Sequence, residues 1–203
     1  MPCLFAALCD RKEHMQLLFV CTGNQCRSVM AEYYCRFRLA QFGVDPENTA
    51  DAITVSSAGT LQYPPHAADP LAIDMLASDG LDAAAHRSTP ISTEISRAAD
   101  LILCFERAQI SELLGQNPAA VRKTFLFDDF VNACAYLGNQ GPIPGDSLEA
   151  KLREVMDSMS MIRPFLPAAN ETVDPHRQSR EVFEQVYAEI KHGIDTIFHT
   201  IGE

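Results

Sequence analysis

The chain has 203 residues, of which 47% are hydrophobic and 21% are charged, and its formal net charge is −11. This composition is typical of a soluble globular protein and excludes collagen-like, disordered and low-complexity chains. Because 27 acidic residues outnumber 16 basic ones, we expect no nucleic-acid partner and no binding to an anionic membrane surface. A site for a small anion would need its own local positive field.

The length suits one domain, since domains commonly have about 100–200 residues. We predict a single domain over residues 15–203 after an N-terminal extension over residues 1–14, with Met15 as a candidate true start. The seven cysteines form no CxxC pair and do not cluster with the six histidines, so we expect no metal and no cofactor. Free cysteines, without a signal or membrane segment, favour a reduced, cytoplasmic protein.

The first half of the chain alternates between predicted strands and helices. The apolar run at 17–20 is typical of a strand buried on both faces of a parallel sheet, and a second short strand is expected at 53–56. Apolar residues at helical spacing predict a helix over 28–43 that ends at a glycine. An Asp-Pro pair predicts the start of a further helix over 69–80.

The second half continues this alternation. Strands are expected at 101–105 and 124–127, and between them a short helix over 107–114 is predicted to end at Gly115. The last helix is predicted to begin near Ser179. Together these elements predict a three-layer α/β/α fold with a central four-stranded parallel sheet.

Residues 131–173 do not fit the alternation of strands and helices. They contain a Gly/Pro-rich turn at 141–145, a predicted helix and a proline-rich exit. We interpret this stretch as an insertion on the domain and not as a second domain.

The turn between the first strand and the first helix carries the chemistry. A Cys and an Arg six positions apart are a weak signal alone, but here the Cys ends a strand, the Arg opens a helix, and Gly23 and Asn24 tolerate positive φ. Backbone N–H groups of such a loop converge beside a helix N-terminus and form an anion site, to which an arginine adds a bidentate fork. The predicted phosphate-binding residues are Thr22, Gly23, Asn24, Gln25, Cys26, Arg27 and Ser28.

The same positive field favours the thiolate form of Cys21, which would make it a nucleophile at neutral pH. The alternative is a buried structural cysteine beside a turn that only caps the helix. A phosphate-binding module without turnover is a further alternative from the same residues.

The run 20–32 resembles the signature of the low-molecular-weight protein tyrosine phosphatase family, which includes bacterial arsenate reductases. The resemblance covers most of 16–130 and 173–198, including the Ser-Ala-Gly-Thr segment at 57–60. It implies a bacterial cysteine-dependent phosphatase that acts on phosphotyrosyl proteins or peptides through a phosphocysteine. It also implies that inorganic phosphate or another oxyanion binds in the loop.

The resemblance assigns the general acid to Asp174, because the family carries an Asp-Pro pair before its last helix and Asp174-Pro175 stands there. Such a group protonates the leaving oxygen and then activates water, a contribution of about 10²–10⁴ in rate. Taken alone, an aspartate in this position more often only caps a turn. The pair at 128–129 provides the alternative acid.

The resemblance also implies supporting roles around the loop. Ser28 would donate a hydrogen bond to the Cys21 thiolate, and a hydrogen-bond network of Asn24, Ser57 and His86 would hold the loop in its conformation. Cys26 would form a reversible disulfide with Cys21. A histidine that only flanks a helix and an inert small cysteine are the alternatives for His86 and Cys26.

Departures from the family pattern leave the substrate open. Val29 replaces a proline, Gln25 stands where the family has an apolar residue or the arginine-phosphatase branch a threonine, and His176 replaces an aromatic residue. Phosphotyrosine is the first choice of substrate and phosphoarginine the second. Arsenate reduction is the third, since it needs two further redox cysteines, for which Cys104 and Cys134 are available.

Overall fold

The computed structural model describes residues 14–45 and 53–202, so nearly all of the predicted N-terminal extension lies outside the described residues. Four strands form one sheet in the order β2-β1-β3-β4, and every neighbouring pair is parallel. The predicted four-stranded parallel sheet is therefore confirmed. The strands are β1 (Met15–Cys21), β2 (Ile53–Gly59), β3 (Leu101–Cys104) and β4 (Thr124–Leu126).

Strand β1 is apolar apart from Gln16, because both faces of the sheet are covered. Successive side chains of a strand point to opposite faces. Leu17 and Phe19 enter a large core, whereas Leu18 and Val20 enter a smaller one on the other face. A continuous apolar run in the sequence was therefore the right signal for this strand.

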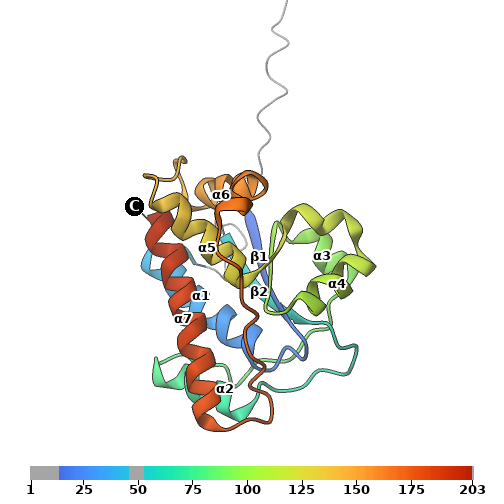
Figure 1. Ribbon diagram of the computed structural model, residues 1–203. Helices are drawn as coiled ribbons and strands as arrows, with labels where there is room; N and C mark the ends of the chain where they lie inside the picture. Colours follow the sequence, from blue (N-terminus) through green and yellow to red (C-terminus); the bar gives the residue numbers. More distant parts are fainter. Residues whose placement is uncertain (1–13, 46–52, 203) are drawn as a thin grey trace, which may run out of the picture.

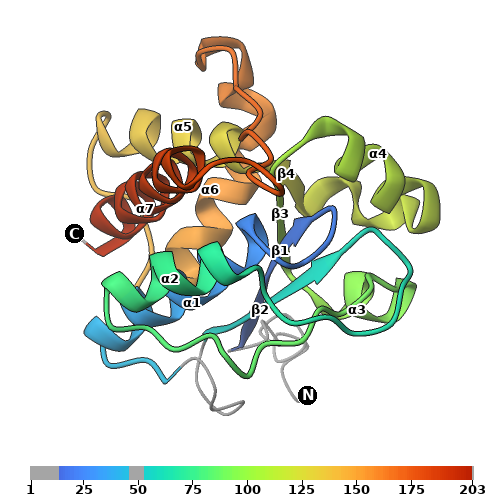
Figure 2. The ribbon, with the colours of Figure 1, turned by 90° about the horizontal axis from the view of Figure 1, so that it is seen from below.

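Helices lie on both faces of the sheet, which confirms the predicted three layers (Figures 1 and 2). The large core is covered by α1 (Arg27–Gln41), α2 (Pro70–Ser78), α5 (Phe127–Gly138), α6 (Leu148–Ile162) and α7 (Arg180–Gly202). The smaller core is covered by α3 (Thr93–Ala98), α4 (Arg107–Gln116) and the 3₁₀ helix η1 (Pro118–Lys123). A second 3₁₀ turn, η2 (Arg163–Phe165), follows α6. Within the described ranges, no helix has both the length and the apolarity to cross a membrane.

Of two helix ends that the sequence predicted from single residues, one agrees with the structure and the other does not. The Asp69 side chain accepts a hydrogen bond from the Leu71 amide at 2.9 Å and so caps α2 as predicted. Gly115, the predicted end of α4, instead lies within that helix, which continues to Gln116. The helix stops at Asn117 because the residue before a proline is disfavoured in the helical region.

Helix α5 corrects the boundary predicted at residue 131, which falls inside it. It begins directly after β4 and buries Phe130, Ala133 and Cys134 in the large core, so the alternation of strand and helix continues to residue 138. Its two acidic residues sit in the first turn, where they are favourable to the helix dipole and do not break the helix. That the following segment up to 173 is an insertion stays a prediction.

Helices α5 and α7 pack closely because α7 carries Gly193 at their contact. A Cβ atom at Gly193 would lie 2.6 Å from Cζ of Phe127 and 3.0 Å from Cγ2 of Val131. Gly115, also in a helix, has open space at the corresponding position. The two helical glycines therefore differ in the space available to a Cβ atom, and Gly115 also lies next to the end of its helix.

We predict that Gly193→Ala lowers the free energy of unfolding by about 1–3 kcal/mol, because overpacking outweighs the gain in helix propensity. Gly115→Ala is expected to raise it by about 0.5–1 kcal/mol, since only the propensity changes. Urea denaturation at unchanged m values measures both effects. Stabilisation by both substitutions would contradict the packing that we describe.

Candidate active site

The loop after β1 lies at the carboxyl edge of the sheet, where open α/β sheets bind ligands. Strand β1 leads into α1 on one face of the sheet, whereas its neighbour β3 leads into α4 on the other face. The two connections diverge and leave a crevice between them. The predicted phosphate-binding loop opens into this crevice.

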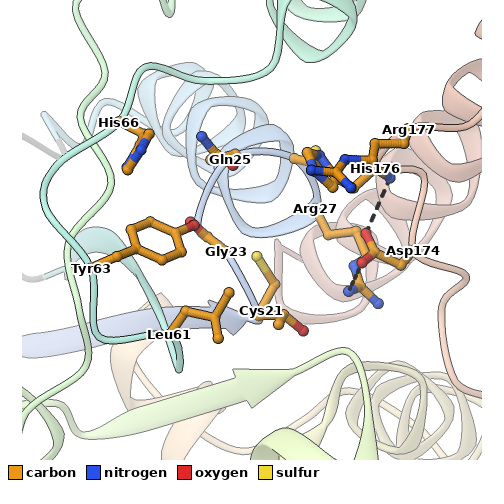
Figure 3. A pocket seen from close by; sticks show the side chains of 12 residues that line it. Cys21, Gly23, Gln25, Arg27, Leu61, Tyr63, His66, Asp174, His176 and Arg177 are labelled. Atoms are coloured by element: carbon orange, nitrogen blue, oxygen red, sulfur yellow. Dashed lines mark hydrogen bonds and ion pairs between the residues drawn. The ribbon is translucent and has the colours of Figure 1, made fainter.

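A pocket of about 540 Å³ occupies this position, and Figure 3 shows the side chains around it. Three segments far apart in the sequence line it, namely the loop after β1, the stretch after β2 and the stretch before α7. The predicted catalytic residues all belong to this lining. The lining residues are Cys21, Thr22, Gly23, Gln25, Cys26, Arg27, Leu61, Tyr63, His66, Asp174, His176 and Arg177.

The Cys21 sulfur lies between two polar groups of its own loop. Its Sγ atom is 3.0 Å from Oγ of Ser28 and accepts a hydrogen bond from the Asn24 amide at 3.3 Å. The cysteine is 2% exposed, so these groups replace most of the water around the sulfur. The arrangement suits a negatively charged sulfur, which hydrogen-bond donors stabilise.

Asn24 connects the loop to its surroundings. It has a φ of 51°, and its side-chain amide donates to Oγ of Ser28 at 3.0 Å and to Oγ of Ser57 at 2.7 Å. Its side-chain oxygen accepts from the Thr89 amide at 2.8 Å, and its backbone oxygen lies 3.0 Å from Nε2 of His86. These contacts hold a backbone conformation that is uncommon outside glycine. The structure thus brings together the four residues expected in the supporting network.

The end of β2 supports the loop from behind. The amides of Thr60 and Leu61 donate to the carbonyl oxygens of Cys21 and Thr22, both at 3.0 Å. A Cβ atom on Gly59 would lie 2.8 Å from the Thr22 oxygen, so only glycine allows this approach. This contact gives a physical reason for the glycine in the 57–60 segment.

Arg27 is almost completely buried, with 1% of its side chain exposed. One guanidinium nitrogen pairs with Glu106 and donates to the Thr172 carbonyl at 2.8 Å, and the other lies 3.3 Å from Oδ2 of Asp174. Nε has no hydrogen-bond partner in the part of the chain that the structure describes. A buried donor without a partner is costly.

Asp174 lies at the mouth of the pocket with 45% of its side chain exposed. It is both in contact with Arg27 and open to a substrate. The alternative acids lie elsewhere, since Asp129 pairs with Arg163 at 2.5 Å and Asp128 accepts from the Asn170 amide at 2.7 Å. Neither of them lines the pocket.

Cys26 lines the same pocket wall as Cys21, and both are free thiols. Burial raises the pKa of the Cys26 thiol well above its ordinary value, and the Asp69 carboxylate and Cys21 raise it further. The disulfide that the resemblance implies between the two cysteines stays a prediction.

Sequence reasoning missed several residues that hold the loop. Gln109 donates to the Thr22 hydroxyl at 3.2 Å, and the Tyr63 hydroxyl donates to the Gly23 carbonyl at 2.6 Å. Glu106 and Gln109 directly follow β3, so their place at the carboxyl edge beside β1 was a signal that could have found them. Tyr63 lies in an irregular segment, and the sequence carried no comparable signal for it.

Comparison with known proteins points to one family. Residues 16–160 match the family described as low molecular weight phosphotyrosine protein phosphatase. The chain is 30% identical over 171 residues to the low molecular weight protein-tyrosine-phosphatase Etp of Escherichia coli K12, covering 84% of each chain. It is 32% identical over 117 residues to a protein-arginine-phosphatase of Bacillus subtilis, covering 58% of this chain and 73% of the relative.

A solved structure, the tyrosine phosphatase Wzb from Escherichia coli K30 in complex with sulphate, superposes with a TM-score of 0.61 at 25% identity. The match covers 90% of this chain and 94% of that one. The family match spans most of the chain, and the similarity to Etp extends over a still longer stretch. The chain therefore belongs to the low molecular weight phosphotyrosine protein phosphatase family.

Proposed function

We propose that this protein is a cysteine-dependent phosphatase that hydrolyses phosphotyrosyl proteins or peptides through a phosphocysteine intermediate. The observation that carries the proposal is the meeting of Cys21, Arg27 and Asp174 in one pocket, although Asp174 lies far from the loop in the sequence. The pocket provides a nucleophile, a cation for the phosphoryl oxygens and an acid for the leaving group.

In the first step the phosphate group binds in the loop, and the Cys21 thiolate attacks phosphorus in line with the leaving oxygen. A sulfur–phosphorus bond forms as the phosphorus–oxygen bond to the substrate breaks. Asp174 gives its proton to the departing oxygen, which leaves as a phenol. Loop amides and Arg27 stabilise the charge on the three remaining phosphoryl oxygens.

In the second step water attacks the phosphocysteine. Asp174, now a carboxylate, takes a proton from the water as its oxygen bonds to phosphorus. The sulfur–phosphorus bond breaks, inorganic phosphate leaves and the Cys21 thiolate is restored. Ser28 and the Asn24 amide, which contact the sulfur, stabilise this leaving thiolate.

The residues that line the pocket favour a substrate with an aromatic ring. Leu61 and Tyr63 form one side of the entrance and offer apolar surface against which a phenyl ring can pack. The strong negative charge of the whole chain favours substrates with basic residues near the phosphate. The five cysteines that the structure describes are all free, and free thiols are typical of a reducing compartment, so we propose a cytoplasmic location.

Phosphoarginine is the second candidate, supported by the similarity to the protein-arginine-phosphatase of Bacillus subtilis. The half-exposed Asp174 carboxylate at the pocket mouth could also pair with a guanidinium. The geometry does not support arsenate reduction by a cysteine relay. Cys104 and Cys134 are fully buried and belong to the cores on opposite faces of the sheet.

We predict that Cys21→Ser lowers the turnover of p-nitrophenyl phosphate by at least about 10³-fold, because a serine hydroxyl is a much weaker nucleophile. Vanadate should still bind, since the loop amides and Arg27 remain. Steady-state kinetics and calorimetric titration with vanadate measure the two effects. Full activity of the variant would contradict the assignment.

The loss of rate on replacement of the general acid should depend on the leaving group of the substrate. Asp174→Asn is expected to slow phenyl phosphate by about 10²–10⁴-fold and to slow activated aryl phosphates much less, because good leaving groups need no proton. Asp128→Asn, a carboxylate outside the pocket, is the matched control and should leave both rates unchanged. Equal slowing of all substrates by Asp174→Asn would place the acid elsewhere.

A comparison of several substrates decides whether the enzyme acts on phosphotyrosine, phosphoarginine or arsenate. We expect kcat/KM for a phosphotyrosyl peptide to exceed that for the matching phosphoarginyl peptide by at least about tenfold, because the apolar wall favours a ring. Arsenate with a thiol reductant should give no arsenite. The opposite order of the two peptides would favour the arginine-phosphatase alternative.

A further inference from the structure

Three side chains that the proposed reaction does not use meet at one edge of the pocket. The Cys26 sulfur, a carboxylate oxygen of Asp69 and a ring nitrogen of His176 all lie within 4.8 Å of one another. They come from three separate segments, namely the phosphate-binding loop, the N-cap of α2 and the stretch that follows Asp174.

The Asp69 carboxylate is held in place by the start of α2. Its Oδ1 atom accepts from the Leu71 amide at 2.9 Å, and its own backbone amide donates to the Gln25 carbonyl at 2.9 Å. Its second oxygen is left to face Nδ1 of His176 at 3.6 Å. The hydrogen bond to one oxygen therefore fixes the direction in which the other can act as a ligand.

The donor set matches a borderline-soft divalent cation. Thiolate sulfur, imidazole nitrogen and carboxylate oxygen are the ligands of tetrahedral zinc, whose bond lengths place ligand atoms about 3.3–3.8 Å apart. The cluster must therefore close by roughly 1 Å around such an ion. His176 can make this movement, since 43% of its side chain is exposed. Magnesium and calcium prefer all-oxygen sites and do not suit a thiolate.

We propose that Cys26, Asp69 and His176 bind a divalent cation of the zinc class, and that the bound ion inhibits the enzyme. On binding, the ion bonds to the Cys26 sulfur and the thiol proton passes to the solvent. Three protein ligands leave a fourth tetrahedral position for water or an anion.

Inhibition follows from where the ligands lie. The His176 amide donates to Oδ1 of Asp174 at 3.3 Å, so an ion that holds His176 also restricts the segment that carries the acid. The ion would share the Cys26 side of the pocket with an incoming phosphate. The inhibitory effect rests on the proposed function, whereas binding of the ion does not.

Cobalt(II) provides a test of binding that does not depend on activity. Addition of Co²⁺ to the untagged, reduced full-length chain should produce the near-ultraviolet absorption of a thiolate–cobalt bond, and Zn²⁺ should displace it. We expect Cys26→Ser to abolish this absorption and Cys21→Ser to retain it. Absorption that is lost in Cys21→Ser and kept in Cys26→Ser would overturn the site, because the ion would then bind the nucleophile.

The other two ligands are tested by zinc affinity. Asp69→Asn keeps an oxygen for the α2 cap, and His176→Asn changes an exposed residue, so both variants should fold. Each should weaken Zn²⁺ binding at least about tenfold, since even the loss of an outer partner of a metal ligand costs 10–100-fold. His192→Ala, an exposed histidine on α7 outside the pocket, is the matched control and should not change the affinity. Wild-type affinity in His176→Asn would overturn the proposal.

Activity measurements then test the consequence of binding. Zn²⁺ should lower kcat for p-nitrophenyl phosphate, and His176→Asn should shift the half-inhibiting concentration upward at least about tenfold. Zinc binding at Cys26 without any loss of activity would overturn the inhibitory role. A metal-free wild-type protein without phosphatase activity would instead contradict the proposed function and leave the cobalt result intact.

Discussion

The site depends on the burial of one positive charge, the Arg27 guanidinium. A buried cation is stable only when its desolvation is offset by partners, and this chain provides them from three places. Glu106 follows β3, Thr172 offers its carbonyl, and Asp174 stands at the pocket mouth. Because all three converge on Arg27, the end of β3 and the segment before α7 are brought to the loop after β1. The proposed general acid is thus placed by the same contact that neutralises the arginine.

The loop itself is held by a second set of contacts that centre on Asn24. Its positive φ turns the backbone so that the amide points at the Cys21 sulfur, and the cost of this conformation is offset by hydrogen bonds to neighbouring segments. One of those partners, Ser57, is in turn hydrogen-bonded to the buried Glu32 of α1. The shape of the nucleophile loop is therefore set by β2 and α1 as much as by its own sequence.

What the sequence could predict was set by the range of the interactions. Strand β1 and the loop after it were recognisable because their signals are local. An apolar run, a glycine and a helix start each involve only a few consecutive residues. Helix α5 was not, because its paired acidic residues resemble a break in the apolar pattern although they suit a first turn. The partners of Arg27 could not be read in the same way, since Glu106 and Thr172 reach it only once the sheet order is fixed.

The cluster of Cys26, Asp69 and His176 is a second example of contacts that the sequence could not predict. The sequence gives no metal-ligand spacing for these residues, and their separation along the chain argues against a zinc motif. They meet because the loop after β1, the cap of α2 and the segment held by Arg27 end at the same edge of the sheet. A site assembled from three connections of a fold is visible only in three dimensions.

The charge of the chain has a local and a global part that act on different portions of a substrate. Within the pocket, Glu106 balances the charge of Arg27, and Asp174 is neutral while it carries the proton that it donates, so little net side-chain charge remains to attract a phosphate. The attraction must then come mainly from the loop amides and the N-terminus of α1, whose field is strong only at short range. The excess of 11 negative charges on the whole chain acts at longer range, where salt screens it. Recognition of the phosphate and selection of its flanking residues therefore have separate physical origins, and the second should weaken more as ionic strength rises.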